Sequence, residues 1–370
     1  MGFSCGIVGL PNVGKSTLFN ALTRASVPAE NYPFCTIDPH TGVVSVPDPR
    51  LAALTELVPT QRVVPTLMEF VDIAGLVAGA SQGEGLGNQF LNHIATVEVI
   101  AHVVRCFEDP QVVHVSGSVD PKRDIDMITT ELILRDLSIA GSALTKLEKT
   151  AKSGDETAMA AAAALREVVA ALDVGRPASS VRPAGPGQAG WDAVQALNLL
   201  SGKPVLYVAN VSETDLASGA EAPGLQAVRQ IAAAQGAEVV PICAAIEAQI
   251  AALESDEERA EYLAAVGLKE PGLHRLIRAG YTLLGLMTFF TVGPKENRAW
   301  TIRQGMTAQE AAGKIHTDMA RGFIRAEIIG YGDFVACGSE AAARAQGKLR
   351  TEGKEYRMRD GDLAHFLFSV

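Results

Sequence analysis

The sequence predicts an α/β protein in which a mostly parallel sheet carries a phosphate-binding loop. Short apolar runs alternate with segments of helical periodicity up to about Gly280, which is the pattern of βα units. A glycine-rich loop, GLPNVGKS, directly follows the first apolar run. Beyond Gly280 the chain changes to short β-rich runs, MTFFTVG, RAWTI, RAEII and HFLFSV, which indicate a separate small α+β module.

Length and composition favour two or three folded domains. The chain has 370 residues, of which 48% are hydrophobic and 20% charged, so enough apolar surface exists to offset the entropy of ordering. The five cysteines lie far apart without a CxxC pair, which argues against a zinc ribbon or a disulfide framework. No apolar run reaches the roughly 18 residues of a transmembrane helix, and the N-terminus lacks the basic region of a signal peptide. We therefore expect a cytoplasmic protein without membrane contact.

Five apolar runs are the candidate strands of the sheet. In chain order they are Ser4–Val8, Leu67–Asp72, Val99–Cys106, Pro204–Asn210 and Glu238–Cys243. Between the third and fourth, from about Ile125 to Leu172, apolar residues recur at helical spacing. We interpret this segment as an antiparallel helical hairpin inserted into the sheet domain; the alternative is a pair of ordinary crossover helices, which are normally shorter. The expected division is a sheet domain with the glycine-rich loop, of residues 1–125 and 197–280, a hairpin domain of residues 126–196 and a C-terminal domain of residues 281–370.

One helix is expected in the C-terminal module. Thr307 and Glu310 have the spacing of a capping box, in which the side chain of each residue bonds the backbone N–H of the other at a helix start. The sequence therefore predicts a helix from Ala308 to about Arg321.

The segment Gly9–Ser16 matches the phosphate-binding motif GxxxxGK[ST], and it lies between an apolar strand and a helix. Its glycines allow backbone N–H groups to turn toward phosphate oxygens, and the helix N-terminus adds the positive end of a dipole. We expect Lys15 to reach the β- and γ-phosphates, which makes it a candidate catalytic residue, and the Ser16 hydroxyl to bind Mg²⁺.

A second motif supplies the acid of a magnesium site. Asp72 ends an apolar run and begins DIAG, a DxxG motif whose Gly75 can turn its N–H toward a γ-phosphate. Between the two motifs, we expect Thr36 to close on Mg²⁺ only when a γ-phosphate is bound. An isolated DxxG is often a turn and an isolated threonine a loop residue, so both assignments depend on the upstream phosphate loop. The predicted metal ligands are Ser16, Thr36 and Asp72.

The base-recognition motif differs from that of GTP-binding proteins. Those proteins usually carry NKxD after a strand, where the Asp accepts hydrogen bonds from guanine. Here the strand VLYVAN leads into Asn210-Val211-Ser212-Glu213, so the Lys is absent and the acid is one methylene longer. This change weakens the geometry that rejects adenine, whereas Asn210 can pair with N6 and N7 of adenine. The sequence favours ATP, and a GTP site of relaxed specificity is the alternative.

Slow hydrolysis is expected because Leu76 follows DIAG, where Ras-type enzymes have the glutamine that orients the attacking water. Other candidates for this role are Glu84, His93, His102 and His114. His102 lies in an apolar strand pattern and is more consistent with the core. His114 lies in a loop after the third strand, where a neutral imidazole can orient water. A structural or surface role for His114 is the alternative.

Charge is unevenly distributed along the chain. Residues 281–370 contain 12 Lys and Arg against 10 Asp and Glu, whereas residues 1–280 contain 20 against 32. Contact with RNA must therefore come from a local patch. The densest basic segment contains Arg344, Lys348, Arg350, Lys354, Arg357 and Arg359. It is a candidate for phosphate contacts, although a solvated domain face explains the same composition. Cys35 is a candidate oxidation sensor or, alternatively, a packed thiol.

Together these motifs resemble the Obg-like ATPase (YchF) family. The resemblance rests on GLPNVGKS, NYPFCTIDPHTGVV, DIAGLVAGASQGEGLGNQFL, RCFEDP, NVSE and the β-rich C-terminal segment, and it extends over essentially the whole chain. It implies a nucleotide-binding G domain, an inserted coiled-coil-like helical domain and a C-terminal TGS domain with a β-grasp fold. It further implies binding of ATP in preference to GTP, slow Mg²⁺-dependent hydrolysis, and association with the ribosome or its large subunit. Within the ribosome, rRNA or a ribosomal protein is the expected contact, and neither DNA nor membrane is an expected partner.

The resemblance also assigns roles to individual residues. Phosphate and Mg²⁺ contacts fall on Gly9, Asn12, Val13, Gly14, Lys15, Ser16, Thr17, Thr36 and Asp72, and adenine contacts on Asn210 and Val211. His114 falls in the loop to which the family assigns the hydrolytic histidine. Asn12 is similar to the asparagine that binds K⁺ in cation-activated relatives, so K⁺ is a candidate cofactor beside Mg²⁺. We expect a nucleotide-dependent switch in translation or stress regulation; a nucleotide-stabilised scaffold with incidental turnover is the alternative.

Overall fold

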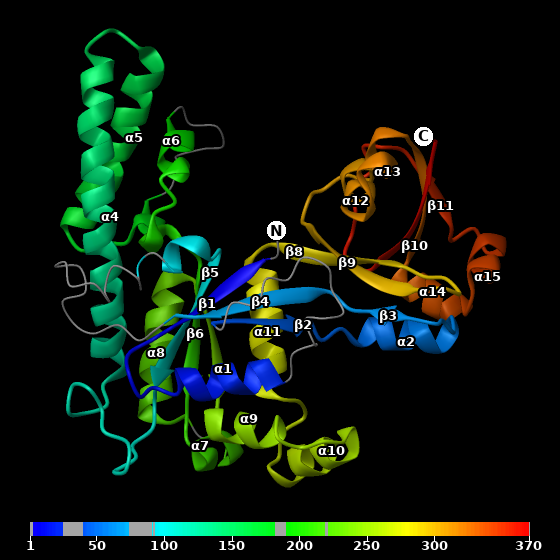
Figure 1. Cartoon of the computed structure of the whole chain (residues 1–370), viewed down its shortest axis with the longest axis horizontal. Coiled ribbons are helices and arrows are strands. Elements are labelled where there is room, and N and C mark those ends of the chain that lie inside the picture. The colour runs from blue at the N-terminus through cyan, green and yellow to red at the C-terminus, as the bar shows by residue number, and fades with distance from the viewer. Residues whose placement is uncertain are drawn as a thin grey trace. The chain divides into compact units, whose positions relative to one another are not determined.

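The computed structural model describes residues 3–24, 40–73, 91, 93–181, 190–218 and 221–369 (Figure 1). The chain forms two compact units, one of residues 1–43 and 69–276 and the other of residues 44–68 and 277–370. It passes between them within strand β2 (Thr41–Ser45), strand β4 (Leu67–Asp72) and helix α11 (Gly272–Leu283). None of the helices that the structure describes combines the length and the apolar character needed to span a bilayer.

The first unit is built on a six-stranded sheet with the order β2-β4-β1-β5-β6-β7. Strands β1 (Ser4–Val8), β4, β5 (Val99–Arg105), β6 (Val205–Asn210) and β7 (Glu238–Ile242) pair in parallel. All five predicted strands are confirmed to within one residue at each end. Every residue of β5 is buried, because a parallel sheet is covered on both faces. The strand is accordingly apolar except for His102 and the terminal Arg105.

Short helices follow the strands of this sheet. They are α1 (Lys15–Arg24), α7 (Glu213–Ser218), α8 (Pro223–Gln235), α9 (Ala244–Ile250) and α10 (Asp256–Ala265). Helix α8 packs Leu225 and Val228 against Tyr207 and Ala209 of β6. This packing covers one face of the sheet. The loops that follow the strands begin at the carboxyl ends of those strands.

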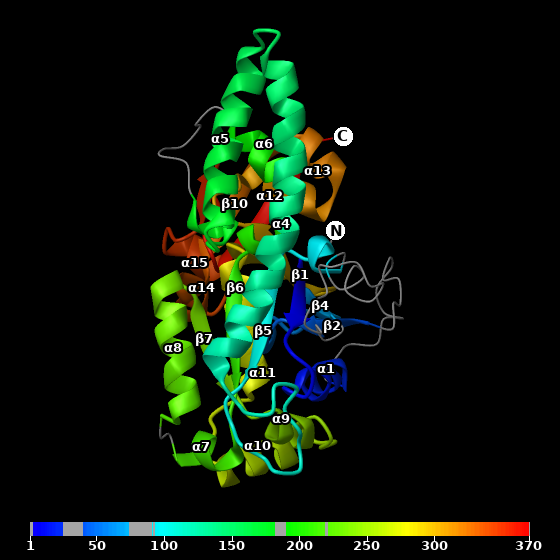
Figure 2. The ribbon, with the colours of Figure 1, turned by 90° about the vertical axis from the view of Figure 1, so that its left-hand side faces the viewer.

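A helical hairpin is inserted after β5, as predicted. Helices α4 (Pro121–Ala151) and α5 (Glu156–Asp173) lie side by side (Figure 2). The carboxylates of Asp120 and Asp155 accept backbone N–H groups at the two helix starts, which satisfies donors that have no partner within a helix. The hairpin core also includes α6 (Trp191–Ala196), and the 3₁₀ turns Ala178–Ser180 and Leu200–Gly202 lead back to the sheet.

Helix α4 belongs to two packing layers. Near its start, Ile125 packs in the cluster of β5, β6 and α8, whereas Ile133 and Ala140 further along pack in the hairpin core. The first turns of α4 are therefore a crossover helix of the sheet and the remaining turns are one arm of the hairpin. A single continuous helix thus joins the end of the sheet to the tip of the insertion.

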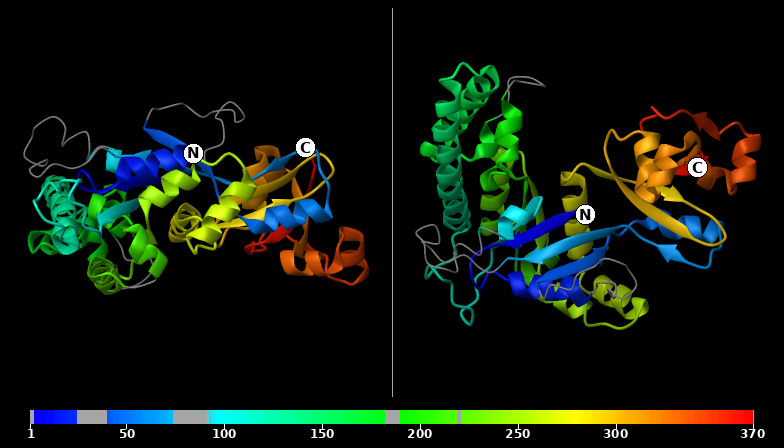
Figure 3. Two further views of the ribbon diagram at one scale, coloured as in Figure 1. Left: turned by 90° about the horizontal axis from the view of Figure 1, so that it is seen from below. Right: turned by 45° about the horizontal axis from the view of Figure 1, so that its top comes forward.

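The second unit contains another six-stranded sheet, with the order β11-β10-β12-β8-β9-β3. Its strands are β3 (Val63–Val64), β8 (Leu286–Thr291), β9 (Asn297–Arg303), β10 (Phe323–Gly330), β11 (Arg350–Glu352) and β12 (Asp362–Phe368). Neighbouring residues point to opposite faces: Phe289 packs against α12 (Ala308–Ile315), and Phe290 packs with α2 (Pro49–Leu57) and α14 (Tyr331–Cys337). The ribbons of α12 and α2 accordingly lie on opposite sides of this sheet (Figure 3). Helix α15 (Glu340–Ala345) contributes Ala343 to the second layer.

The helix expected from Ala308 to Arg321 is divided in two. The predicted capping box of Thr307 and Glu310 is present at the start of α12. At His316, however, the backbone is extended, with φ −158° and ψ 142°, and a second helix, α13 (Thr317–Arg321), begins there. The His316 ring accepts the N–H of Asp318, so this side chain caps a new helix instead of continuing the first one.

The compact second unit also includes residues 44–68, which the sequence-based division placed in the first domain. Leu51 and Leu54 of α2 pack with residues from the far end of the chain, among them Phe290. Arg50 further ties α2 to this unit through an ion pair with Asp360 at 2.6 Å, whereas its ion pair with Asp48 at 2.8 Å is local to the start of α2. The partners of α2 are more than two hundred residues away in the sequence, so no local pattern indicates where it packs.

Candidate nucleotide-binding site

Those predicted site residues that the structure describes converge on one edge of the first sheet. Because the strands are parallel, their carboxyl ends meet at the same edge, where ligands of α/β proteins usually bind. Strand β1 ends before the phosphate loop, β4 ends at Asp72, and β6 ends at Asn210. Asp72 is the register partner of Ile7, and Asn210 is the register partner of Arg105. The register therefore brings these separate motifs to neighbouring strand ends.

The phosphate loop has a backbone shape that its glycines permit. Gly14 has φ +99°, and Asn12 also has a positive φ of 62°, a region that disfavours most side chains. A Cβ atom on Gly14 would lie 2.3 Å from Nδ2 of Asn210, and one on Gly9 would lie 2.5 Å from the carbonyl oxygen of Val103. Both glycines are therefore needed for close approach as well as for backbone freedom.

Lys15 is buried and bonded within its own loop. Its ammonium group donates to the carbonyl oxygen of Leu10 at 2.7 Å. Burial lowers the pKa of Lys15 to about 8, and attraction to the carboxylate of Asp72 partly opposes this change. Desolvation thus brings the pKa of Lys15 close to neutral pH, while the ammonium group is still mostly charged at pH 7. A phosphate oxygen would favour the charged ammonium and replace the carbonyl contact.

Asp72 has a carboxylate oxygen available for a cation. Its Oδ1 is buried and has no hydrogen-bond partner among the described residues. Burial raises the pKa of Asp72, and the charges of Lys15 and His40 act in the opposite direction. Ser16 and Thr17, at the start of α1, are exposed. A carboxylate oxygen without a partner among the described residues and an exposed hydroxyl fit Mg²⁺, which takes few protein ligands and is completed by phosphate and water. Thr36 and Gly75 lie outside the described residues.

Asn210 is bonded to the protein through both ends of its amide. Its Nδ2 donates to the carbonyl oxygen of Val13 at 2.9 Å, and its Oδ1 accepts the N–H of Ala244 at 3.1 Å. The side chain therefore ties the phosphate loop to the start of α9. The side chain of Val211 is buried in the cluster of β5, β6 and α8, and Glu213 is exposed in the first turn of α7.

The histidines proposed for water activation differ in their surroundings. His102 is buried within β5, where desolvation lowers its pKa to about 3, so it is a neutral core residue as the sequence indicated. His93 is exposed. His114 lies in the loop after β5, and its Nε2 is 2.9 Å from Oδ2 of Asp124, with both side chains only 3% exposed. Leu76, Glu84 and Cys35 lie outside the described residues.

Arg105 organises the loop that contains His114, a role that the sequence analysis did not predict. Its guanidinium group is buried and donates to the carbonyl oxygens of Val112 at 2.9 Å, Phe107 at 3.1 Å and Asp109 at 3.3 Å. It also lies 4.8 Å from the centre of the Phe107 ring. An arginine that ends an apolar strand and precedes a polar loop is the only local signal for such an arrangement.

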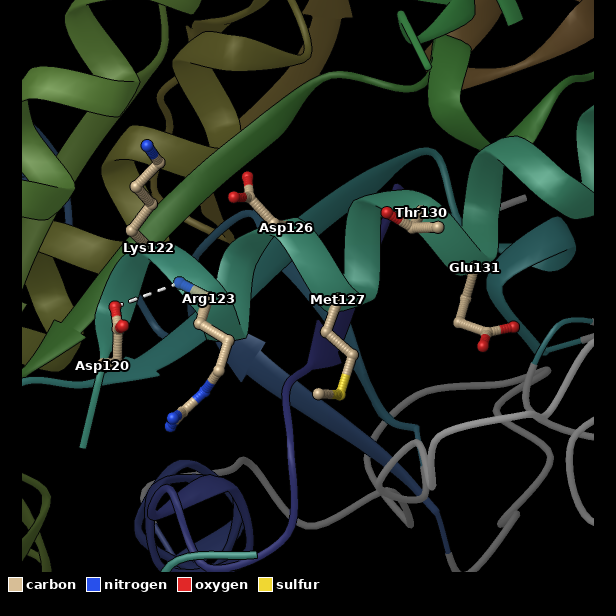
Figure 4. A pocket seen from close by; sticks show the side chains of 7 residues that line it. All are labelled: Asp120, Lys122, Arg123, Asp126, Met127, Thr130 and Glu131. Carbon is tan, nitrogen blue, oxygen red and sulfur yellow. Dashed lines mark hydrogen bonds between the residues drawn. The ribbon is translucent and has the colours of Figure 1, made fainter. Parts of the chain in front are cut away.

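A shallow groove lies along the first turns of α4. Figure 4 shows Arg123 and Met127 on one side of the helix and Lys122 and Asp126 on the opposite side. The remaining lining residues are Asp120, Thr130 and Glu131. Positive and negative side chains are mixed here, so the groove has no charge preference suited to a triphosphate. The nucleotide site is better placed at the strand ends.

The basic segment near the C-terminus is largely neutralised within its own unit. Arg344 pairs with Glu327 at 3.0 Å and with Glu340 at 3.3 Å. Lys348 pairs with Asp333 at 3.1 Å, and Arg350 pairs with Glu352 at 3.2 Å. Arg357 donates to the carbonyl oxygen of Gly305. Within the described part of the unit, only Lys354 and Arg359 of this segment lack a side-chain ion pair or hydrogen bond. The arrangement favours the solvated-face interpretation for most of the segment.

Comparison with known proteins extends over the whole chain. A family model described as a 50S ribosome-binding GTPase matches residues 4–135, and a YchF-GTPase C-terminal model, described as a protein of unknown function, matches residues 286–369. The ribosome-binding ATPase YchF of Haemophilus influenzae is 54% identical and that of Bacillus subtilis 51% identical, each over 370 residues and 100% of both chains.

A solved structure, the YchF GTPase of Schizosaccharomyces pombe, has a TM-score of 0.86 and 37% identity, with 99% of this chain and 98% of that chain covered. The likeness thus includes both sheets and the helical insertion as well as the phosphate loop. With such identity over the full length of its relatives, the chain belongs to the YchF family.

Proposed function

We propose that this protein is a ribosome-binding, Mg²⁺-dependent ATPase whose conformation depends on the γ-phosphate of its nucleotide. One observation carries the proposal: two complementary groups interact at this site. The phosphate loop buries the ammonium group of Lys15, and the carboxylate that attracts it, Asp72, has an Oδ1 without a partner among the described residues. Buried charges and polar atoms are costly without partners. A triphosphate with a divalent cation suits both groups, because its oxygens can replace the Leu10 carbonyl at the ammonium group and the cation gives the Asp72 carboxylate the partner that its Oδ1 lacks among the described residues.

Ser16, Thr36 and Asp72 are the residues that would hold Mg²⁺. When bound, the ion neutralises charge on the β- and γ-phosphates. K⁺ is the second candidate ion, with Asn12 as its proposed ligand. The resemblance of the phosphate loop supports this assignment. Because the Asn12 amide nitrogen donates to the carbonyl oxygen of Val113 at 3.0 Å, the amide oxygen is the atom that would bind the ion.

In the proposed reaction, backbone N–H groups of residues 9–17 bind the phosphates, and Lys15 exchanges the carbonyl of Leu10 for phosphate oxygens. Gly75 contacts the γ-phosphate, and His114 orients the attacking water. The water oxygen bonds to the γ-phosphorus as the bond to the β,γ-bridging oxygen breaks, which releases ADP and phosphate. We expect slow turnover because Leu76 cannot orient water. Replacing His114 with Ala should lower kcat without weakening ATP binding.

ATP is the proposed substrate, with Asn210 and Val211 beside the adenine. The absence of the NKxD lysine and the exposed position of Glu213 support this choice. GTP is the second candidate, because the Schizosaccharomyces pombe structure is titled a GTPase and one family model is described as a GTPase. Competition of ATP and GTP for a fluorescent nucleotide analogue in the presence of Mg²⁺ tests the choice. A lower Kd for GTP than for ATP would contradict it.

The proposed partner is the ribosome, which the protein would contact through the large subunit. A ribosome-binding protein acts where translation takes place, so we propose a cytoplasmic location. The Haemophilus influenzae and Bacillus subtilis relatives are named ribosome-binding ATPases. Co-sedimentation with ribosomes and isolated large subunits, in ATP, in ADP and without nucleotide, tests both partner and switch. Equal sedimentation in the three conditions would instead support a nucleotide-stabilised scaffold. Crosslinking would then distinguish rRNA from a ribosomal protein as the contact.

A further inference from the structure

The loop between β5 and α4 buries its histidine and exposes its valines. His114 is 6% exposed, whereas its neighbours Val113 and Val115 are 74% and 49% exposed. Apolar side chains are normally buried in preference to imidazole. The hydrophobic effect therefore does not explain this conformation of the loop. Specific polar contacts must hold it.

The first of these contacts is a chain of hydrogen bonds through the His114 ring. The backbone N–H of Ser116 donates to Nδ1 at 3.1 Å, and Nε2 lies 2.9 Å from Oδ2 of Asp124. Because a backbone N–H can only donate, Nδ1 carries a lone pair and the ring proton is on Nε2, directed at Asp124. Both nitrogens are thus occupied, and the ring has no atom left to orient water in this conformation.

Two further contacts place the loop between the phosphate loop and α4. Asn12 of the phosphate loop donates to the carbonyl oxygen of Val113, the residue directly before His114. Arg105 fixes the preceding turn through the carbonyl oxygens of Phe107, Asp109 and Val112. The main chain at residue 113 therefore contacts the phosphate loop, while the imidazole of residue 114 is bonded to the first turn of α4.

We propose that Asp124 is a positioning residue that stores His114 away from the phosphates, and that release of His114 from Asp124 limits hydrolysis. The inference rests on the proposed function, in which His114 orients the attacking water. A released loop frees the imidazole and can bury Val113 and Val115 in exchange. Since α4 continues from Asp124 into the helical hairpin, a shift of α4 along its axis would act on the same contact.

Replacing Asp124 with Ala leaves the Nε2–H of His114 without an acceptor in a buried site. An unsatisfied buried donor changes a conformational equilibrium by roughly five- to a hundredfold. The stored conformation is therefore depleted in Asp124→Ala. We expect kcat for ATP to rise by about three- to tenfold, because release is then no longer limiting. The KM for ATP should change by less than about twofold, since the phosphate loop keeps its own contacts.

The test compares single-turnover and steady-state ATP hydrolysis by the full-length wild type and the variants Asp124→Ala, His114→Ala and the double variant. Asp126→Ala, an exposed carboxylate two residues further along α4, is the matched control and should match the wild type. The expected result is a faster Asp124→Ala and a double variant as slow as His114→Ala. An unchanged or slower Asp124→Ala, or a double variant that stays fast, overturns the inference.

A second readout does not depend on activity. ¹⁵N correlation spectra of the histidine rings should show a slowly exchanging, hydrogen-bonded Nε2–H for His114 in the wild type and rapid exchange of this proton with water in Asp124→Ala. If Asp124→Ala fails to fold, Asp124→Asn takes its place, because its amide oxygen can still accept the Nε2–H as a weaker, neutral partner. We then expect an intermediate rise in kcat, and no rise overturns the inference. If His114→Ala hydrolyses ATP at the wild-type rate, the proposed role of His114 itself fails, which is a different outcome.

Discussion

Asn210 donates a hydrogen bond from its side-chain amide to the carbonyl oxygen of Val13, at 2.9 Å, across 197 residues of sequence. The same side chain accepts the N–H of Ala244. A residue expected to recognise the base is therefore also a structural link between the phosphate loop and α9. This double role determines how its substitution should affect the protein.

Replacing Asn210 with Ala should weaken binding of ATP and GTP to a similar extent. The change leaves the Val13 carbonyl and the Ala244 N–H without their partners in a buried site, which costs about 1–3 kcal/mol of stability. Nucleotide competition assays and thermal unfolding measure the two effects. Thr214→Ala, on the exposed turn nearby, is the control. A changed ratio of ATP to GTP affinity at unaltered stability would instead assign Asn210 mainly to base recognition.

The affinity for ATP should fall as pH rises above the pKa of Lys15. That pKa is lowered to about 8 in the nucleotide-free protein, and phosphate oxygens raise it again on binding. Below pH 8 the ammonium is already charged, so the affinity is nearly constant. Above pH 8 a proton must be taken up on binding, and Kd should rise roughly tenfold per pH unit.

Calorimetry at pH 7, 8 and 9 in buffers of different ionisation enthalpy measures both the affinity and the proton uptake for this prediction. Lys15→Arg is the matched variant, because guanidinium remains charged over the whole range. Proton uptake that persists in Lys15→Arg would assign the titration to another group.

Arg105→Lys should loosen the loop after β5. The guanidinium contacts three carbonyl oxygens at once, and an ammonium group cannot reproduce this planar fork. We expect a loss of about 1–3 kcal/mol of stability, because partly buried carbonyls lose their donors. Amide hydrogen exchange at residues 107–115 should accelerate by about tenfold or more. The control is Arg166→Lys, an exposed arginine in α5. Unaltered exchange in Arg105→Lys would show that the loop is held by other contacts.

Ribosome binding should depend on only part of the basic C-terminal segment. Arg344 and Lys348 are paired with carboxylates of their own unit, so their charge is already compensated. Lys354→Gln and Arg359→Gln should therefore reduce co-sedimentation with ribosomes at about 0.15 M salt more than Arg344→Gln and Lys348→Gln. Equal losses for both pairs would indicate that the whole segment contacts the ribosome, and no loss for either would move the contact elsewhere.

Local sequence was sufficient for most of the first sheet and for the phosphate loop. The strands were predictable because parallel strands buried on both faces are largely apolar, as Val99–Arg105 is apart from His102 and Arg105. Helices α12 and α13 were harder to predict, because the single extended residue His316 divides a segment whose periodicity favours one helix. The packing of α2 in the second unit was not predictable, since Leu51 and Leu54 gain their apolar partners from the other end of the chain.

The sequence by itself determined the loop that we propose as the phosphate cradle, because the backbone geometry of Gly9–Ser16 is set by its own glycines and by the strand and helix beside it. Only the tertiary structure decided that His114 is paired with Asp124, that Arg105 holds the loop before it, and that most basic residues near the C-terminus are neutralised. Motif spacing reflects local chain geometry, which is encoded within a few residues. Hydrogen bonds and ion pairs between side chains depend on distances and burial that exist only after the elements have packed.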